Sequence, residues 1–207
     1  MAPSHSFAEA IKTRRSYYAL SSDLEVSDSK LEEIVQFYLK HLPSTFNSQS
    51  SRAVLVLHDD HRKVWDFTKD GLIAAIGEQA YENGTKDKIN GFRGAYGTVL
   101  LFEDTTVIKG LQEKMPTYAD KFPQFADHAH GGLAIALWTA LENEVPGLGA
   151  NLQHYNPLPD AAIKKEYDLP ESWELKAQLV FGKIVAPTYE KSFEPIEKRF
   201  KSFGAKN

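Results

Sequence analysis

Apolar and polar residues recur at helical spacing in two segments near the start of the chain. The first segment predicts a helix over residues 6–18 that ends in two arginines. The second, SKLEEIVQFYLKHLP at 29–43, carries an apolar stripe, and Ser29 and Glu32 are spaced as a capping box. We therefore expect two helices before the first strand.

Two continuous apolar runs further along are typical of strands that are buried on both faces. They are AVLVLH at 53–58 and GAYGTVLLFED at 94–104, and ELKAQLVFGK at 174–183 predicts another strand. Between the first two runs, residues 59–90 show a polar helical pattern. Its candidate core positions are Val64, Trp65, Ile73, Ile76 and Tyr81.

The most apolar helix is expected in the second half of the chain. The stretch 105–126 mixes helical spacing with prolines, which predicts a broken helical excursion. A nearly apolar helix follows, beginning near Asp127 and ending before Pro146. A short polar helix is expected over 159–168. Because helices and strands mix without regular βαβ alternation, the pattern favours the α+β class.

Composition limits the size of the core and the choice of partners. The 207 residues are 42% hydrophobic and 25% charged, which is enough for one sizeable core. The length favours one domain or two very unequal ones. The 24 basic and 28 acidic residues are mixed, which argues against nucleic acid or an anionic membrane as a partner.

Cysteine is absent from the sequence, which excludes disulfides, thiolate nucleophiles and thiolate metal sites. The N-terminus lacks the apolar core of a signal peptide, and the longest apolar run, at 133–141, is too short to span a bilayer. We expect a cytoplasmic protein, with a share in the nucleus left open.

Several well-known catalytic motifs are missing. The sequence has no GxxxxGK[ST] loop, no complete dinucleotide fingerprint, no GxSxG and no HExxH. HDDH at 58–61 and DHAH at 127–130 offer ligand atoms for a metal, but their spacing is a weak signal. We favour a solvated turn for the first and a helix start capped by Asp127 for the second.

Four polar clusters remain, and each has a plain structural interpretation. They are RRS at 14–16, NSQ at 47–49, GLGANLQHY at 147–155 and EKSFEP at 190–195. The arginines suit the negative end of a helix dipole, NSQ suits a turn, GLG ends a helix, and the tail carries ordinary surface charge. None of the clusters indicates a function alone.

Taken in order, these clusters resemble the FMN-dependent nitroreductase family, in its branch of small fungal and bacterial proteins. The resemblance is carried by RRSYYAL, PSTFNSQSSR, MPTYADKFPQF and GLGANLQHYNP, and it extends from about Phe7 to Phe200. It implies an α+β, nitroreductase-like fold with a central, mostly antiparallel sheet flanked by helices. It implies a single nitroreductase-like domain over 1–207, with a lid-like excursion at about 105–126 and a C-terminal tail from about residue 184. It also implies an intertwined homodimer with FMN at the subunit interface. The helix 131–141 would lie at that interface, and the tail would reach across the partner.

The resemblance implies a set of cofactor-binding residues. These are Arg14, Arg15, Ser16, Asn47, Gln49, Gln153, His154 and Lys191. The arginines and the serine, with the tail lysine, would hold the flavin phosphate, which an arginine fork suits because charge-assisted bonds are strong. The amides of NSQ would meet the ring and ribityl group, and a backbone N–H at 153 or 154 would bond flavin N5.

The sequence departs from the family pattern at two places. The family commonly has a basic residue where this chain has Tyr18, and Lys191 would supply part of the missing charge. Most relatives have an acidic residue and a glycine where this chain has His154 and Tyr155. A backbone role at this pair therefore carries over better than a side-chain role.

A substrate pocket is also implied, with aromatic residues that cover flat molecules. Its members would be Phe46, Tyr118, Phe122 and Phe125. Core packing explains these aromatics equally well, because aromatic side chains bury readily in either setting.

The implied activity is an NAD(P)H-dependent nitroreductase that reduces nitroaromatic, quinone or similar flat acceptors by a ping-pong mechanism. FMN would be the cofactor, NADH or NADPH the donor, and neither a catalytic side chain nor a metal would be needed. Two other hypotheses stay open. One is a flavin-binding regulatory or stress-response protein with little turnover, and the other is a structural protein that has lost the cofactor.

Overall fold

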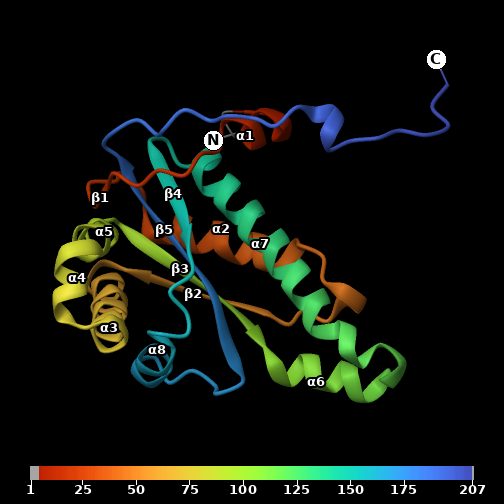
Figure 1. The fold of residues 1–207 in the computed structure, drawn as a ribbon, viewed down its shortest axis with the longest axis horizontal. Helices are drawn as coiled ribbons and strands as arrows, with labels where there is room; N and C mark the ends of the chain where they lie inside the picture. Colours follow the sequence, from red (N-terminus) through yellow and green to blue (C-terminus); the bar gives the residue numbers. More distant parts are fainter. Residues whose placement is uncertain (1–4, 207) are drawn as a thin grey trace.

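The structure is a computed structural model that describes residues 5–206, and one antiparallel sheet with helices on both faces organises it (Figure 1). The strands are β1 (Leu20–Ser21), β2 (Ser51–Leu57), β3 (Gly97–Asp104), β4 (Leu148–Gln153) and β5 (Trp173–Ile184). The α-helices are α1 (Phe7–Thr13), α2 (Asp28–His41), α3 (His58–Ile76), α4 (Glu78–Gly84), α5 (Lys86–Arg93), α6 (Thr105–Lys114), α7 (Phe122–Glu144) and α8 (Asp160–Glu166). Short 3-10 helices are η1 (Thr45–Asn47), η2 (Pro116–Lys121) and η3 (Ile196–Lys198). The predicted α+β class with a mostly antiparallel sheet is confirmed.

The sheet is built around its longest strand, β5. On one side β5 pairs with β3, which in turn pairs with β2, and β4 and the short β1 also pair with β5. All of these pairs are antiparallel, and a parallel bridge from Ser16 to Ala150 extends the sheet beyond β4. The chain that leaves α1 is therefore fixed to the edge formed by β4.

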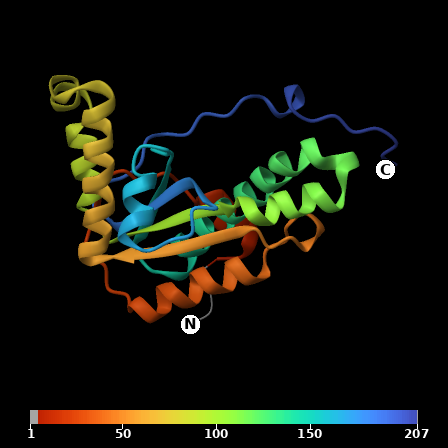
Figure 2. The ribbon, with the colours of Figure 1, turned by 90° about the horizontal axis from the view of Figure 1, so that it is seen from below.

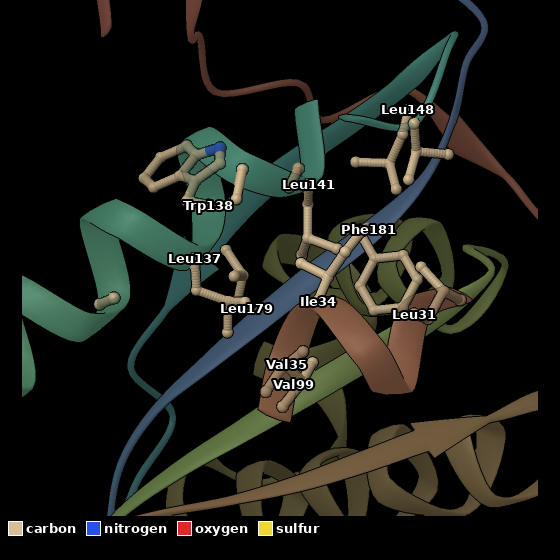
Figure 3. Packing of buried hydrophobic residues seen from close by; sticks show 14 of the residues in the cluster. Leu31, Ile34, Val35, Val99, Leu137, Trp138, Leu141, Leu148, Leu179 and Phe181 are labelled. Atoms are coloured by element: carbon tan, nitrogen blue, oxygen red, sulfur yellow. The ribbon is translucent and has the colours of Figure 1, made fainter. Parts of the chain in front are cut away.

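Alternation along the central strands supplies a core on each face of the sheet. Val99, Leu101, Leu179 and Phe181 pack with α2 and α7, as Figure 3 shows in part. Leu100, Phe102, Leu175 and Val180 belong to the clusters on the opposite side, with α3, α5 and α8. The central strands β3 and β5 therefore bury side chains on both faces, which is why β3 contains the continuous apolar run of residues 99–102.

The two predicted buried strands differ in the structure. Every residue of β3 is buried, as expected. In β2 only Val56 is fully buried, so the prediction of burial on both faces is wrong for this strand. The reason is its place in the sheet, because β2 pairs with β3 alone and forms an edge.

The first two helices are confirmed, but their ends differ from the prediction. The first ends at Thr13, because Arg14 turns to an extended ψ of 129° and the chain then joins the sheet at Ser16. The cap of α2 is Ser27, whose side chain accepts the backbone N–H of Lys30 at 3.2 Å. The predicted cap, Ser29, lies inside the first turn of the helix.

The second half of the chain follows the prediction, with two corrections. The excursion is broken into α6 and η2 as expected. The apolar helix α7 begins at Phe122 rather than near Asp127, since a proline is tolerated in the first turn of a helix. Its end before Pro146 is confirmed. The segment after GLG is not only a helix end, because it forms strand β4, which the sequence did not indicate.

Within 59–90, Val64, Trp65 and Tyr81 are buried as predicted, whereas Ile73 is half-buried and Ile76 is exposed. HDDH is not a solvated turn, because His58 begins α3. Figure 2 shows α3, α4 and α5 at one end of the molecule and α6 with the start of α7 at the other. Among residues 5–206, no helix is long and apolar enough to cross a membrane.

The C-terminal segment after β5 runs as an extended tail (Figure 1), and its residues Thr188 and Tyr189 hydrogen-bond with Ser16 and Arg15, beyond the end of α1. Its apolar side chains face solvent. They are Val185, Tyr189, Phe193, Ile196, Phe200 and Phe203. So many exposed apolar side chains along one segment are unusual on the surface of a monomer.

Candidate functional site

Two clusters that lie far apart in the sequence meet beside the end of α1. Residues 14–16 and 18, together with residues 188–192, line a hollow of about 370 Å³. The guanidinium of Arg15 donates to the backbone carbonyl of Tyr189, and the hydroxyl of Thr188 donates to the carbonyl of Ser16 at 3.0 Å. These contacts bring Lys191 to the same hollow as the arginines. The structure therefore unites the first and last of the four polar clusters.

A carboxylate on α7 bonds the backbone of the segment that lines this hollow. Glu142 accepts the backbone N–H of Arg15 and the backbone N–H of Ala150, each at 3.1 Å, and the indole N–H of Trp138 at 2.7 Å. The guanidinium of Arg14 lies 4.2 Å from the centroid of the Trp138 ring. Burial raises the pKa of Glu142 to about 7, although its three bonds and the charge of Arg14 oppose that rise.

Strand β4 leads away from the arginines along an open sheet edge. The carbonyl of Ala150 accepts the N–H of Tyr17 at 2.9 Å, so both the N–H and the carbonyl of Ala150 point away from β5. Because backbone directions alternate, Leu152 and His154 turn their backbone groups toward the same side. The step from Ala150 to His154 covers about 13 Å at the rise of a strand.

The two sequence-predicted residues at the end of β4 behave differently. Gln153 is buried and pairs with Gln178 of β5, and its side-chain amide donates to Oδ1 of Asn151 at 2.8 Å. His154 follows the strand and is exposed. The backbone of His154 is therefore better placed for a ligand at this edge than the side chain of Gln153.

The NSQ loop is held in an unusual backbone conformation. Phe46, Asn47 and Gln49 have φ angles of 54°, 52° and 51°, which non-glycine residues adopt at a cost of about 1–3 kcal/mol each. The hydroxyl of Ser44 accepts the N–H of Gln49 at 2.8 Å, and the guanidinium of Arg52 donates to the Gln49 carbonyl at 2.6 Å. Such strain persists where surrounding contacts enforce it, and it clusters at functional sites.

A buried acid anchors the strand that follows the loop. The hydroxyls of Ser50 and Ser51 each donate to Glu103 at 2.5 Å. Burial raises the pKa of Glu103. The hydrogen bonds of Glu103 and of Arg52 hold the backbone in place beside the loop, so the exposed side chains of Asn47 and Gln49 extend from a fixed backbone.

The structure does not bring the NSQ loop to the arginines within one chain. The ring of Phe46 lies 5.9 Å from that of Phe122, the first residue of α7, whereas Glu142 stands in the last turn of the same helix. Twenty residues of helix separate these points by about 30 Å. The predicted cofactor residues therefore form two groups at opposite ends of α7, as the course of this helix in Figure 1 shows.

The four predicted pocket aromatics divide between core and surface. Phe122 is 2% exposed, and its ring lies 6.0 Å from that of Phe125, which is half-buried. Phe46 and Tyr118 are 62% and 52% exposed. Core packing therefore accounts for Phe122, while Phe46 and Tyr118 are free to cover a flat molecule.

The histidine motifs have different surroundings from those expected. His61 is buried, and its ring nitrogens bond the hydroxyl of Thr98 and the carbonyl of Phe92, each at 3.0 Å. His130 lies inside α7, and its buried Nδ1 has no hydrogen-bond partner among residues 5–206; burial lowers its pKa to about 4, and the charge of Lys176 acts in the same direction. In residues 5–206, no group of three or more acidic or histidine side chains could hold a metal ion.

Sequence reasoning missed two residues that shape the first group, Trp138 and Glu142. Their signal was an acid in the otherwise apolar run LAIALWTALE, where a charge needs partners if it is buried. The identity of those partners depends on contacts between distant segments, so the sequence could not supply it.

Comparison with known proteins gives consistent matches over nearly the whole chain. The model of the nitroreductase family matches residues 11–183. Putative nitroreductase HBN1 of Saccharomyces cerevisiae is 37% identical over 189 residues, which cover 90% of this chain and 92% of the relative. Nitroreductase FRM2 of the same yeast is 37% identical over 195 residues, 93% of this chain and 95% of the relative. The structure of nitroreductase CinD from Lactococcus lactis in complex with 4-nitrophenol has a TM-score of 0.86 at 41% identity, covering 96% of this chain and all of that chain.

Proposed function

The chain belongs to the nitroreductase family, and on that premise we propose that it is an FMN-dependent oxidoreductase. It would use NADH or NADPH to reduce nitroaromatic, quinone or similar flat acceptors, and it would work in the cytoplasm. The observation that carries the proposal is the hollow between residues 14–18 and 188–192, which adjoins the open edge of β4.

The residues around the hollow fit the phosphate of FMN. Three positive charges line the hollow, from Arg14, Arg15 and Lys191, and one negative charge comes from Glu190. An arginine fork matches the geometry of a phosphate, and charge-assisted bonds are the strong ones. The hydroxyl of Ser16 adds a donor beside them. The bond from Arg15 to the tail holds Lys191 near this group.

The edge of β4 fits the rest of the cofactor. It begins at Ala150, beside the arginines, and its outward backbone groups at Leu152 and His154 follow at the spacing of a strand. We assign the bond to flavin N5 to a backbone N–H at the pair Gln153 and His154, and we favour His154 because Gln153 pairs with β5. The ring would then lie about 13 Å from the phosphate end.

The second group of residues requires a second copy of the chain. The NSQ loop lies about 30 Å from the arginines along α7, which is longer than one FMN molecule. We therefore propose a homodimer in which the arginines, β4 and the tail of one subunit share each flavin with Asn47 of the partner subunit and Gln49 of the partner subunit. The exposed apolar side chains of the tail support this arrangement, since the partner would cover them.

The predicted interface helix contributes less surface than its sequence suggests. Most of the apolar side chains of α7 are buried in their own chain, and Ile135, at 40%, is an exposed exception. Phe7, Ile11 and Phe37 on α1 and α2 are exposed as well. The proposed interface therefore combines one outer stripe of α7 with neighbouring helices.

When bound, FMN would take up a hydride from NADH or NADPH and pass it, or electrons, to the acceptor in a ping-pong cycle. The protein would hold the phosphate, orient the ring against β4 and leave one face accessible. Phe46 and Tyr118 would cover a flat acceptor there. The complex of CinD with 4-nitrophenol supports acceptors of this shape.

Stopped-flow mixing tests the proposal. The purified protein is mixed with NADH or with NADPH, and flavin absorbance at about 450 nm is followed. We expect bleaching with at least one donor and recovery when 4-nitrophenol or a quinone is added. A flavin that stays oxidised for minutes with both donors would instead support the regulatory, flavin-binding hypothesis.

A further inference from the structure

Glu142 is a half-buried acid that the proposed reaction does not use, yet it has three partners in three parts of the molecule. The N–H of Arg15 belongs to the segment that leaves α1, and the N–H of Ala150 belongs to β4. The third partner, Trp138, lies one turn earlier on α7. Of these parts, the segment that leaves α1 lines the hollow to which we assign the phosphate, and β4 adjoins that segment through the bridge from Ser16 to Ala150.

Both arginines of the hollow are connected to this carboxylate. The backbone N–H of Arg15 donates to Oε2 of Glu142 at 3.1 Å, and this bond also restrains the backbone that leads into Ser16. Arg14 is connected through Trp138, whose indole N–H donates to Glu142 while its ring lies 4.2 Å from the Arg14 guanidinium. Neither connection requires Glu142 to touch a ligand.

We propose that Glu142 is the positioning residue of the phosphate end of the flavin site, acting through the backbone of Arg15 and through Trp138 on Arg14. The inference rests on the proposed FMN site. It adds a residue outside the predicted cofactor-binding set, and it limits the effect of that residue to the end of the cofactor that carries the phosphate.

The chemistry of the three partners explains why a carboxylate stands here. All three are N–H donors, and an ionised carboxylate is an acceptor at both oxygens. A glutamine has one acceptor oxygen. Its NH₂ group is a donor and cannot accept a hydrogen bond from the N–H group that faces it. Glu142→Gln therefore keeps the shape of the side chain but releases one partner, and within residues 5–206 the Arg15 N–H is the only hydrogen-bond partner of Oε2.

The negative charge of Glu142 repels a bound phosphate. A role as a charge and a role as a positioning residue therefore predict opposite changes in FMN affinity. If Glu142 acted chiefly as a negative charge, Glu142→Gln would strengthen FMN binding, because it removes repulsion. If Glu142 acts by holding Arg14, Arg15 and Ser16 in place, the same variant weakens FMN binding. The direction of the change therefore separates the two roles.

Riboflavin, which lacks the phosphate, provides the internal control. The affinities of full-length, flavin-free protein for FMN and for riboflavin are measured by quenching of flavin fluorescence. For Glu142→Gln we expect about tenfold weaker FMN binding and unchanged riboflavin binding. For Glu144→Gln, a matched variant two residues on whose carboxylate contacts Lys30 and Tyr38, we expect no change with either ligand.

Two results with Glu142→Gln would overturn the inference. One is an equal loss of FMN and riboflavin binding, which would show a general structural role, and the other is unchanged or tighter FMN binding. A wild-type protein that binds neither flavin would refute the proposed function itself, and the inference with it.

A second variant tests the route through Trp138. Trp138→Phe removes the indole N–H but retains an aromatic ring under Arg14. Because Glu142 then has one donor fewer to satisfy, Glu142→Gln should cost less FMN affinity in this background than in the wild type. Additive losses would contradict the connection of Glu142 to Arg14.

Discussion

Glu142 accepts the backbone N–H of Arg15 at 3.1 Å, although 127 residues separate the two in the sequence. The bond ties the last turn of the central helix α7 to the segment that leaves α1. It stands where α1, α7 and β4 meet, beside the hollow that the tail closes. The position of the hollow is therefore set by packing among distant segments.

Replacement of Arg14 tests the phosphate assignment. Arg14→Ala should lower FMN affinity by about 1.5–3 kcal/mol, because it removes a charge-assisted hydrogen bond. The measurement is flavin content after extensive dialysis. Lys12→Ala, on the exposed side of α1, is the matched control and should keep its flavin. If Arg14→Ala also keeps a full complement, the assignment of Arg14 is wrong.

Mixed dimers test whether two subunits share each site. One variant is Arg14→Ala, and the other is the double variant Asn47→Gly and Gln49→Gly, since glycine suits the positive φ at both positions. In each homodimer both shared sites are defective. In a mixed dimer, one site combines intact Arg14 from one subunit with an intact NSQ loop from the other.

We therefore expect flavin binding and activity to reappear when the two inactive variants are unfolded together and refolded. At most one site in each mixed dimer should recover. Refolding each variant alone is the control. No recovery, in preparations where mixed dimers are demonstrated, would mean that one chain supplies both groups of residues.

The strained NSQ loop gives a stability prediction. Ser44→Ala removes the acceptor of the Gln49 N–H and should lower the free energy of unfolding by about 1 kcal/mol. Urea unfolding measures this change. Ser48→Ala, in the same loop, is the control, because the structure records no side-chain hydrogen bond for Ser48 among residues 5–206. Equal stability of the two variants would show that the Ser44 bond does not hold the loop.

His61 gives a prediction on pH. Burial lowers the pKa of His61 from 6.5 to about 4, so the unfolded chain takes up a proton at this residue that the folded chain refuses. The stability contributed by neutral His61 is complete above pH 6.5 and is lost as the pH falls toward 4. The difference in unfolding free energy between wild type and His61→Gln should therefore shrink over this range. A difference that does not vary with pH would contradict it.

Local patterns were sufficient for much of the fold. The apolar run of β3 predicted a fully buried strand, and Pro146 predicted the end of α7. β4 was missed because Asn151 and Gln153 make its sequence look polar. In the structure these two side chains are buried and bond one another, so a polar sequence forms a largely buried strand.

The sequence could nominate residues for the candidate site, but it could not show how they are arranged. Sequence resemblance nominated Arg14, Ser16 and Lys191, and the structure places them around one hollow. It gave no distances, so it could not show that Asn47 and Gln49 lie at the other end of α7. Their roles with the cofactor stay predictions, as do those of the other nominated residues.

The flavin content of the purified full-length protein tests the central claim most directly. We expect a yellow solution with absorbance bands at about 370 and about 450 nm, and a flavin released by heat that mass spectrometry identifies as FMN. One FMN per chain is the predicted stoichiometry, because a symmetric dimer contains two shared sites. A colourless protein that also fails to bind added FMN would contradict the claim.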